Sequence, residues 1–154
     1  MLEVEQDLWE VKASCRVITI NCYLKQDHSL VMGRGCALEA RNRYPELPYE
    51  WARNLFMSRS QSGPFFDKER KLIGFPVKPK VHYIPAMWAT DNPEYQHPGW
   101  MWGGKIQSPG CYAKVLEMIL RNVPELVELV HLENIKGTIV LPRLGCGAGG
   151  LSWK

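Results

Sequence analysis

The chain has 154 residues, of which 45% are hydrophobic and 23% are charged, as in an ordinary globular protein. A chain of this length is expected to form one domain, residues 1–154, and to bury roughly 68–70% of the surface that its unfolded form exposes. No apolar run approaches the ~20 residues of a membrane-spanning helix. A net charge of +3 is too small to indicate nucleic-acid binding by itself.

The N-terminus and the cysteines indicate the compartment. Residues 1–7 are acidic and lack the basic and then apolar layout of a signal peptide. The five cysteines form an odd set without a CxxC pair, so we expect them to be reduced thiols. The sequence therefore predicts a soluble cytoplasmic protein with no membrane partner.

The first half of the chain predicts two strands and two helices. Leu2–Leu8 alternates apolar and charged residues, as an outer strand does. Arg16–Ile20 is a continuous β-branched run, which favours a central parallel strand. Ala37–Tyr44 is rich in helix formers and stops before a proline, and a second short helix is expected over Pro48–Arg59.

The second half predicts two more strands and a helix. Lys71–Pro76 predicts a buried strand that ends at its proline, and Val77–Gly104 has the composition of a long binding loop or lid. Ser108-Pro109 is expected to open a helix that Pro124 interrupts. The apolar face of this helix is predicted to comprise Tyr112, Val115, Leu116 and Ile119.

Thr138–Leu141 is the last predicted strand. Strands that alternate with helices indicate an α/β protein whose sheet is parallel at its centre and covered on both faces. In such sheets, ligands bind beyond the carboxyl ends of the strands.

Two glycine-rich stretches follow buried strands. The first is Met32–Cys36, a short loop after Ile18–Cys22, and the second is Gly145–Gly150, directly after the last strand. Glycine lets backbone N–H groups approach an anion closely. We therefore expect both loops to line one phosphate-containing ligand.

Neither stretch fits the better-known phosphate-binding motifs. The P-loop pattern GxxxxGK[ST] does not occur. Gly145–Gly150 contains a literal GxGxxG, but it lies four residues from the end of the chain. The Rossmann motif belongs to the first strand–helix turn of its unit, with an acidic residue ~20 positions later. Both alternatives are rejected.

Taken together, the motifs resemble the macrodomains, a family that binds ADP-ribose. The resemblance rests on Asp7-Leu8, on I-T-I-N-C at 18–22, on V-M-G-R-G-C at 31–36 and on L-P-R-L-G-C-G at 141–147. It is closest to the branch that removes ADP-ribose from proteins or DNA. It implies a three-layer α/β/α fold around a mixed, centrally parallel sheet. The chain stops at Lys154, where relatives continue into a helix and a final strand, so these elements are expected to be missing or the sheet to be completed differently.

The resemblance also implies roles for individual residues. Asp7 would accept a hydrogen bond from the adenine amino group, the backbone of Leu8 would add a contact, and Asn21 would bind the distal ribose. Backbone groups of two loops would wrap the diphosphate and distal ribose. These loop residues are Met32, Gly33, Arg34, Gly35 and Cys36 in the first loop, and Gly145, Cys146, Gly147, Ala148 and Gly149 in the second.

Each role has a plainer structural alternative. Asp7 could only begin a turn, and Asn21 could make an Asx turn. The glycine loops could be tight turns without a ligand. Arg34, where relatives often have lysine, could add positive charge or simply be solvated.

Lys78 is the first candidate for catalysis, with Asn21 as the second. It resembles the lysine of an F-P-x-K stretch that is catalytic in the DNA-directed branch, where it could hold the distal ribose or stabilise its opened form. The alternative is a surface lysine in a loop rich in lysine and proline. Gly149 stands where some protein-directed enzymes carry a catalytic aspartate, which argues against their covalent-intermediate chemistry here.

Three other features could contribute to the site. Trp88, Trp100 and Trp102 could stack on a base or attach their segment to the core. The residues from Tyr23 to Leu30 form an insertion that could reshape the distal-ribose pocket. A thiolate nucleophile or a zinc site lacks supporting spacing, the residues concerned being Cys22, Cys36, Cys146, His28 and His82.

The sequence therefore predicts an ADP-ribose-binding macrodomain that hydrolyses ADP-ribose from a modified nucleic acid or protein, or phosphate from ADP-ribose 1″-phosphate. The alternative is a reader that binds ADP-ribose without cleaving it. Neither function requires a metal or another cofactor. The expected partners are ADP-ribose or an ADP-ribosylated macromolecule, including a nucleic acid, and the chain is expected to be a monomer.

Overall fold

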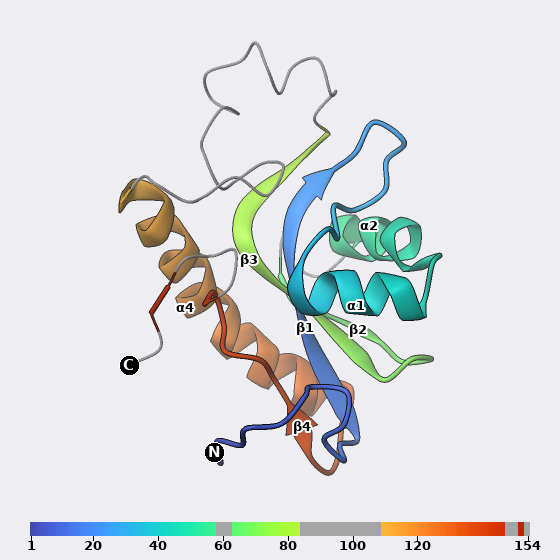
Figure 1. Cartoon of the computed structure of the whole chain (residues 1–154), viewed down its shortest axis with the longest axis vertical. Helices are drawn as coiled ribbons and strands as arrows, with labels where there is room; N and C mark the ends of the chain where they lie inside the picture. The colour runs from blue at the N-terminus through green and yellow to red at the C-terminus, as the bar shows by residue number, and fades with distance from the viewer. Residues whose placement is uncertain (58–62, 84–108, 147–150, 153–154) are drawn as a thin grey trace.

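The computed structural model describes residues 1–57, 63–83, 109–146 and 151–152 (Figure 1). Helices and strands alternate along these residues as the sequence predicts. The elements in chain order are β1 (Cys15–Leu24), α1 (Gly35–Arg43), α2 (Leu47–Met57), β2 (Phe65–Asp67), β3 (Leu72–Tyr83), α4 (Pro109–Leu132) and β4 (Ile139–Val140).

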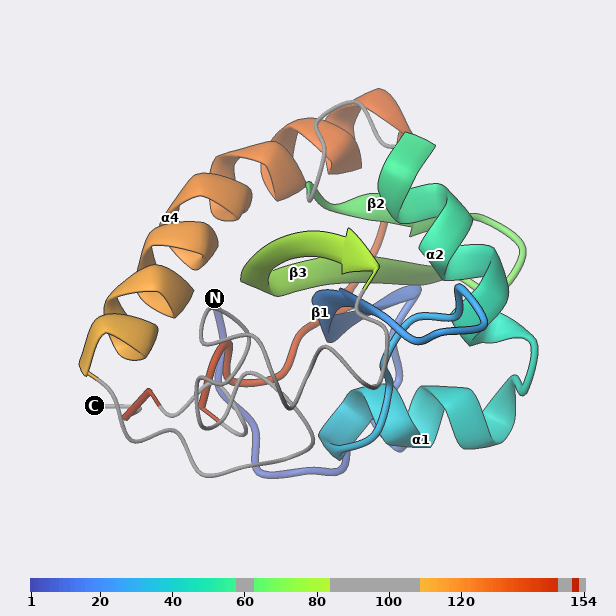
Figure 2. The ribbon, with the colours of Figure 1, turned by 90° about the horizontal axis from the view of Figure 1, so that it is seen from above.

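The strands form one mixed sheet in the order β2-β3-β1-β4. β1 pairs in parallel with both β3 and β4, and β2 pairs antiparallel with β3. The predicted central parallel strand, Arg16–Ile20, lies inside β1 and is confirmed. Figures 1 and 2 show α1 and α2 on one side of the sheet and α4 on the other. The predicted three-layer α/β/α fold with a centrally parallel sheet is therefore confirmed.

Each helical layer covers a separate apolar cluster on its own face of the sheet, because successive side chains of a strand point to opposite faces. On the side of α1 and α2, Ile18 and Ile20 pack with Trp51, whose ring meets Phe65 edge-on at 5.1 Å between centroids. On the side of α4, Val17 and other alternate strand residues pack against the helix. Each fully buried aliphatic or aromatic side chain contributes about 1.5–3 kcal/mol.

Both helices predicted in the first half of the chain are confirmed. The helix expected over Ala37–Tyr44 is α1, and that expected over Pro48–Arg59 is α2 as far as Met57. Residues 58 and 59 lie outside the described residues. The last strand is confirmed but is shorter than Thr138–Leu141.

The prediction of an outer strand at Leu2–Leu8 is wrong. An outer strand needs a neighbouring strand and a core face to cover, whereas Leu2 and Val4 are exposed. The segment turns instead, since the carbonyl of Asp7 accepts hydrogen bonds from the N–H groups of Glu10 and Val11 at 3.1 and 3.2 Å. No strand precedes β1 among the residues that the structure describes.

The prediction that Pro76 ends its strand is also wrong. β3 continues to Tyr83, so Val77–Tyr83 belongs to the sheet and not to an irregular segment. The pairing with β1 shifts at this proline, because Ile20 pairs with Pro76 whereas Asn21 pairs with Lys78. Proline is tolerated within a sheet at such a bulge. The rest of the predicted binding loop, residues 84–104 with its three tryptophans, lies outside the described residues.

Pro124 does not interrupt its helix. α4 begins at Pro109, the predicted first helical position, and runs through Pro124 to Leu132. A proline removes one backbone hydrogen bond, and side chains on both sides of it pack on the sheet, among them Val115 and Ile119 before it and Leu126 after it.

The predicted apolar face of α4 is only partly right. Val115 and Ile119 are buried, but Leu116 is 47% exposed. Met118 and Asn122 take its place in the buried face. The side chain of Tyr112 lies outside the described residues.

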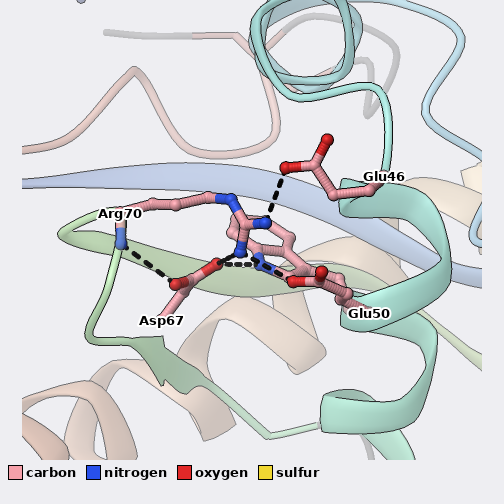
Figure 3. Close-up of polar contacts among 5 residues, drawn as sticks. Glu46, Glu50, Asp67 and Arg70 are labelled. Carbon is pink, nitrogen blue, oxygen red and sulfur yellow. Dashed lines mark hydrogen bonds and ion pairs between the residues drawn. The ribbon is translucent and has the colours of Figure 1, made fainter.

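An ionic cluster joins α2 to the turn between β2 and β3 (Figure 3). The guanidinium of Arg70 contacts carboxylate oxygens of Glu46 at 2.7 Å, Glu50 at 2.7 Å and Asp67 at 2.9 Å. Asp67 is buried and also accepts a hydrogen bond from Nε1 of Trp51 at 2.9 Å. The cluster therefore fixes α2 at the edge of the sheet, away from the carboxyl end of β3.

Candidate functional site

The first glycine loop ends at the start of α1. Gly33 and Gly35 have open space where a Cβ would lie, and Gly35 adopts the left-handed φ of +55°. Arg34 is the N-cap residue, but its side chain makes no capping hydrogen bond, and the first turn of α1 contains no acidic residue. The first N–H groups of a helix carry partial positive charge and need an acceptor. This end of α1 can therefore bind an anion.

The side chains of this loop divide between core and surface. Met32 is buried, so only its backbone can contact a ligand, whereas Arg34 is exposed. The thiol of Cys36 lies 3.2 Å from Oγ1 of Thr19 in β1, and burial raises its pKa. The contact places the beginning of α1 beside the middle of β1 (Figure 1).

The second glycine loop follows β4 and bends at Gly145, whose φ is +74°. A Cβ there would lie 2.8 Å from side-chain atoms of both Ile119 and Leu151, so the position admits only glycine without rearrangement. The carbonyl of Gly145 accepts a hydrogen bond from the N–H of Leu151 at 2.9 Å. Cys146 is half-buried, and its N–H donates to the carbonyl of Arg143. The remaining predicted residues, Gly147, Ala148 and Gly149, lie outside the described residues.

Both loops lie along the same edge of β1. Leu24 pairs with Tyr83 of β3 on one edge and with Leu30 on the other, so the chain that leads into the first loop runs on the edge away from β3. β4 pairs with the beginning of β1 on that same edge. The middle of β1 therefore lies between the first loop and the described beginning of the second loop at Gly145 and Cys146.

Asn21 and Lys78 lie at the same register position of β1 and β3. Lys78 is only 6% exposed, so the alternative of a surface lysine is wrong. Oδ1 of Asn21 accepts a hydrogen bond from the N–H of Tyr23 at 3.0 Å, which is the Asx-type contact considered as its plainer role. Its amide group can also donate from Nδ2. The predicted catalytic pair thus lies on the two central strands of the sheet.

Asp7 and Leu8 form a turn before β1. Oδ1 of Asp7 accepts from the N–H of Trp9 at 2.8 Å, and the carbonyl of Leu8 accepts from Nε of Arg16 at 3.0 Å. The turn expected as the alternative role of Asp7 is therefore present. A carboxylate has a second oxygen and further lone pairs, so the turn is compatible with recognition of an amino group.

Arg16 and Trp9 hold this turn, and sequence reasoning missed both. Nη2 of Arg16 donates to the carbonyls of Trp9 and Val11 at 3.2 and 2.7 Å. The Trp9 ring lies under two guanidinium groups, those of Arg43 at 4.4 Å and Arg16 at 5.8 Å from its centroid, and its Nε1 donates to Glu39 at 2.8 Å. A charged residue at the start of a buried strand was the signal that could have revealed Arg16.

The Tyr23–Leu30 insertion is a tight turn fixed to α2. Asp27 accepts hydrogen bonds from the N–H and Oγ of Ser29, and its other oxygen accepts from the Tyr49 hydroxyl at 3.0 Å. These contacts, the two from Ser29 above all, lower the pKa of Asp27 to about 2. The N–H of Leu30 also donates to the carbonyl of Pro48 at 2.8 Å. The insertion therefore extends the carboxyl end of β1 in a defined conformation.

Two of the described cysteines, Cys15 and Cys36, do not support thiolate chemistry. Burial raises the pKa of Cys15 to about 11 and also raises that of Cys36, so both remain protonated at neutral pH. Within the described ranges, no three His, Cys, Asp or Glu side chains are grouped so that they could hold a metal ion. In the same ranges, no helix is long and apolar enough to cross a membrane.

The open positions at Gly33 and Gly35, the uncapped start of α1 and the bend at Gly145 lie along one edge of the parallel strand β1 in an α/β protein. Comparison of the whole structure with solved structures finds the macrodomain of Mycobacterium tuberculosis DarG, with a TM-score of 0.59 and 23% sequence identity over 97% of this chain and 80% of that one. Comparison of the sequence with models of protein families and with curated proteins finds no match. The chain thus has the macrodomain fold.

Proposed function

We propose that the protein binds ADP-ribose at the edge of β1 between its two glycine loops. The macrodomain fold and the uncapped start of α1 support this proposal. The diphosphate would accept hydrogen bonds from N–H groups at Gly33–Cys36 and Gly145–Gly149, with the positive end of α1 directed at it. Adenine would meet the turn at Asp7-Leu8, and the distal ribose would lie near Asn21.

We further propose that the protein is a hydrolase acting on ADP-ribose attached to a nucleic acid or a protein, or on ADP-ribose 1″-phosphate. The observation that carries this proposal is the burial of Lys78 at the register position of Asn21. Lysine side chains are mostly exposed and are almost never fully buried unless they are paired. Because Lys78 shares the register position of Asn21, we assign it to the distal ribose, where the bond is cleaved.

The chemistry uses positioning and charge. In the glycosidic reaction, a water oxygen bonds to C1″ of the distal ribose while the bond from C1″ to the macromolecule breaks, and the leaving atom takes up a proton. Lys78 would stabilise the charge that develops on the ribose or its opened form, and Asn21 would orient the ribose hydroxyls. Gly149 provides no carboxylate, so no covalent aspartyl intermediate is proposed.

The test is to incubate the protein with ADP-ribosylated DNA, ADP-ribosylated protein and ADP-ribose 1″-phosphate, and to measure free ADP-ribose and phosphate. Turnover of one of the three identifies the class of substrate on which the hydrolase acts. Absence of turnover on all three rejects the hydrolase. Calorimetric titration with ADP-ribose is carried out in parallel, and absence of binding rejects the site itself.

A non-catalytic reader of ADP-ribose is the second candidate. Glycine at position 149, where some protein-directed relatives have a catalytic aspartate, favours it. Micromolar binding of ADP-ribose without turnover of the three substrates would support the reader over the hydrolase.

A further inference from the structure

A bulge in β3 separates the regular part of the sheet from Lys78. Between Ile20 and Asn21 the pairing on β3 advances from Pro76 to Lys78, so β3 contains one residue more than β1 at this point. A β-bulge of this kind changes the direction of the side chains that follow, and such bulges are common next to active sites. Without the extra residue, Val77 would occupy the position opposite Asn21.

Pro76 explains why the bulge forms here. A proline has no N–H and cannot donate to the neighbouring strand. Its carbonyl also bonds outside the sheet, because Nδ2 of Asn122 in α4 donates to it at 2.9 Å. Pro76 therefore lacks a donor, and its acceptor is bound by a side chain from another layer.

Asn122 is unusual for a residue of its kind. Its side chain is fully buried among apolar residues of α4, including Val115, Met118 and Ile119. Burying an amide without hydrogen bonds costs roughly 1–3 kcal/mol, so a buried amide is strongly tied to its partners. The neighbouring Arg121 also donates to Oδ1 of Asn122 at 3.3 Å. The amide therefore holds the carbonyl of Pro76 in one position.

We propose that Asn122 is a positioning residue, which sets the place of Lys78 by fixing the bulge at Pro76. It acts through the backbone of β3, by its hydrogen bond to the carbonyl of Pro76. The inference rests on the proposed function for its catalytic consequence, since Lys78 is the catalytic lysine of that proposal. Its structural part, control of Lys78 by Asn122, can be measured without any turnover.

Two variants disturb the bulge, one at Asn122 in α4 and the other at Pro76 in β3. Asn122→Leu keeps the volume and removes the donor to Pro76, and Pro76→Ala restores an N–H that favours regular pairing. Met118→Ala is the control, because it alters another buried residue of α4, whose side chain has no hydrogen-bond donor for the bulge. Thermal unfolding establishes the temperature range in which each variant is folded.

The first readout is the NMR signal of the Lys78 Nζ group, assigned with Lys78→Arg and followed through a pH titration. The expected result is a shifted signal and a shifted titration midpoint in Asn122→Leu and Pro76→Ala, with values close to wild type in Met118→Ala. If Asn122→Leu and Pro76→Ala both titrate like the wild type, the inference is overturned. If one of them does not fold, the other decides.

The second readout is turnover of the substrate found above. Displacement of a catalytic group by about 1 Å can lower a rate on the order of 100-fold. We expect kcat to fall by that order in the two variants, with the Kd for ADP-ribose changed less than about threefold and kcat retained in Met118→Ala. A normal kcat in both variants contradicts the inference while leaving the hydrolase intact. A wild-type protein without turnover rejects the hydrolase, and the Lys78 signal still decides the role of Asn122.

Discussion

Asn21 of β1 and Lys78 of β3 face each other across the central strand pair, directly after the bulge at Pro76. The two residues thus lie on paired strands of the sheet, whereas the backbone groups proposed to bind the ligand belong to the loops around them. Sites built on strands are more accurately positioned than sites built on loops alone. Binding and cleavage can therefore be separated experimentally.

The first prediction separates ligand binding from cleavage by a substitution at Lys78. Lys78→Met keeps the length of the side chain and removes its charge. We expect turnover to fall on the order of 100- to 1000-fold, because a charge aimed at the developing transition state is lost, and the Kd for ADP-ribose to change only a few-fold. Lys71→Met, at an exposed lysine beside the start of β3, is the control and should behave as wild type. Equal turnover in the two variants would remove Lys78 from the mechanism.

The second prediction concerns two glycines with different surroundings. Gly145→Ala combines a left-handed φ with contacts of 2.8 Å to Ile119 and Leu151. We expect the free energy of unfolding to fall by about 2–4 kcal/mol. Gly33→Ala adds a methyl group at a point where the described residues, apart from the chain neighbours, have no atom within 4 Å. Stability should therefore change by less than about 0.5 kcal/mol.

The same pair tests the ligand. Because the methyl group of Gly33→Ala would point into the space assigned to the diphosphate, we expect its Kd for ADP-ribose to rise at least about tenfold, or about 1.4 kcal/mol. Denaturant unfolding and calorimetric titration measure the two effects. A Gly33→Ala protein that binds ADP-ribose like the wild type would show that the ligand does not approach this loop.

The third prediction distinguishes the two roles of Asp7. In Asp7→Asn, the remaining carbonyl oxygen can still accept from the N–H of Trp9, so the turn is kept. The second oxygen becomes an amide donor, which cannot accept from the adenine amino group. Loss of such a partner costs about 1–3 kcal/mol, and ADP-ribose should bind correspondingly more weakly.

Hypoxanthine provides the control, because it has a carbonyl where adenine has its amino group. The wild type should prefer ADP-ribose over its hypoxanthine analogue, and Asp7→Asn should reduce or reverse this preference. If Asp7→Asn binds both ligands with the affinities of the wild type, Asp7 stabilises the turn and does not recognise adenine.

The fold and the site were predictable to different degrees. The β-branched run at Arg16–Ile20 and the helix formers before Pro45 predicted β1 and α1, because local propensity and burial agree there. Glycine is also a local signal in the two loops, because the φ values of +55° at Gly35 and +74° at Gly145 favour that residue type.

The failures concern tertiary contacts that local patterns do not contain. Pro76 and Pro124 look like terminators, but each lies in an element whose neighbours pack on both sides of it. The alternation at Leu2–Leu8 predicted a strand, whereas this segment pairs with none of the strands in the described part of the chain. Arg16 and Asn122 donate hydrogen bonds to backbone carbonyls, and Trp9 donates one to the carboxylate of Glu39. Sequence spacing cannot reveal these contacts.

The fourth prediction follows from the acidity of Asp27. Hydrogen bonds from Ser29 and Tyr49 lower the pKa of this carboxyl group to about 2. A carboxyl whose pKa is lower in the folded state stabilises the protein at pH values above its unfolded pKa of about 3.9, and this contribution is lost as pH falls toward 2. Asp27→Asn should therefore flatten the decrease in stability between about pH 4 and pH 2.

Denaturant unfolding at several pH values measures this slope. Glu117→Gln, at an exposed residue on the outer side of α4, is the control for removal of a surface carboxylate. If Asp27→Asn and Glu117→Gln have the same slope as the wild type, the contacts of Asp27 do not form in solution.

The fifth prediction concerns the ionic cluster of Arg70. Arg70→Met leaves the buried carboxylate of Asp67 without its cation, although Trp51 still donates to it. Removal of one partner from a buried ion pair costs about 3–5 kcal/mol, and we expect a loss near the lower end. Arg70→Lys should recover only part of it, because one ammonium group cannot reproduce a planar guanidinium that contacts three carboxylates. Glu46→Gln, at a half-exposed partner, should lose less than about 1 kcal/mol.

Ligand binding should not respond to these changes. Six residues of β3 separate this end of the strand from Lys78, so the Kd for ADP-ribose of folded Arg70→Met should equal that of the wild type. A large change in the Kd for ADP-ribose without a change in stability would contradict this prediction. It would mean that the ionic cluster of Arg70 affects ligand binding.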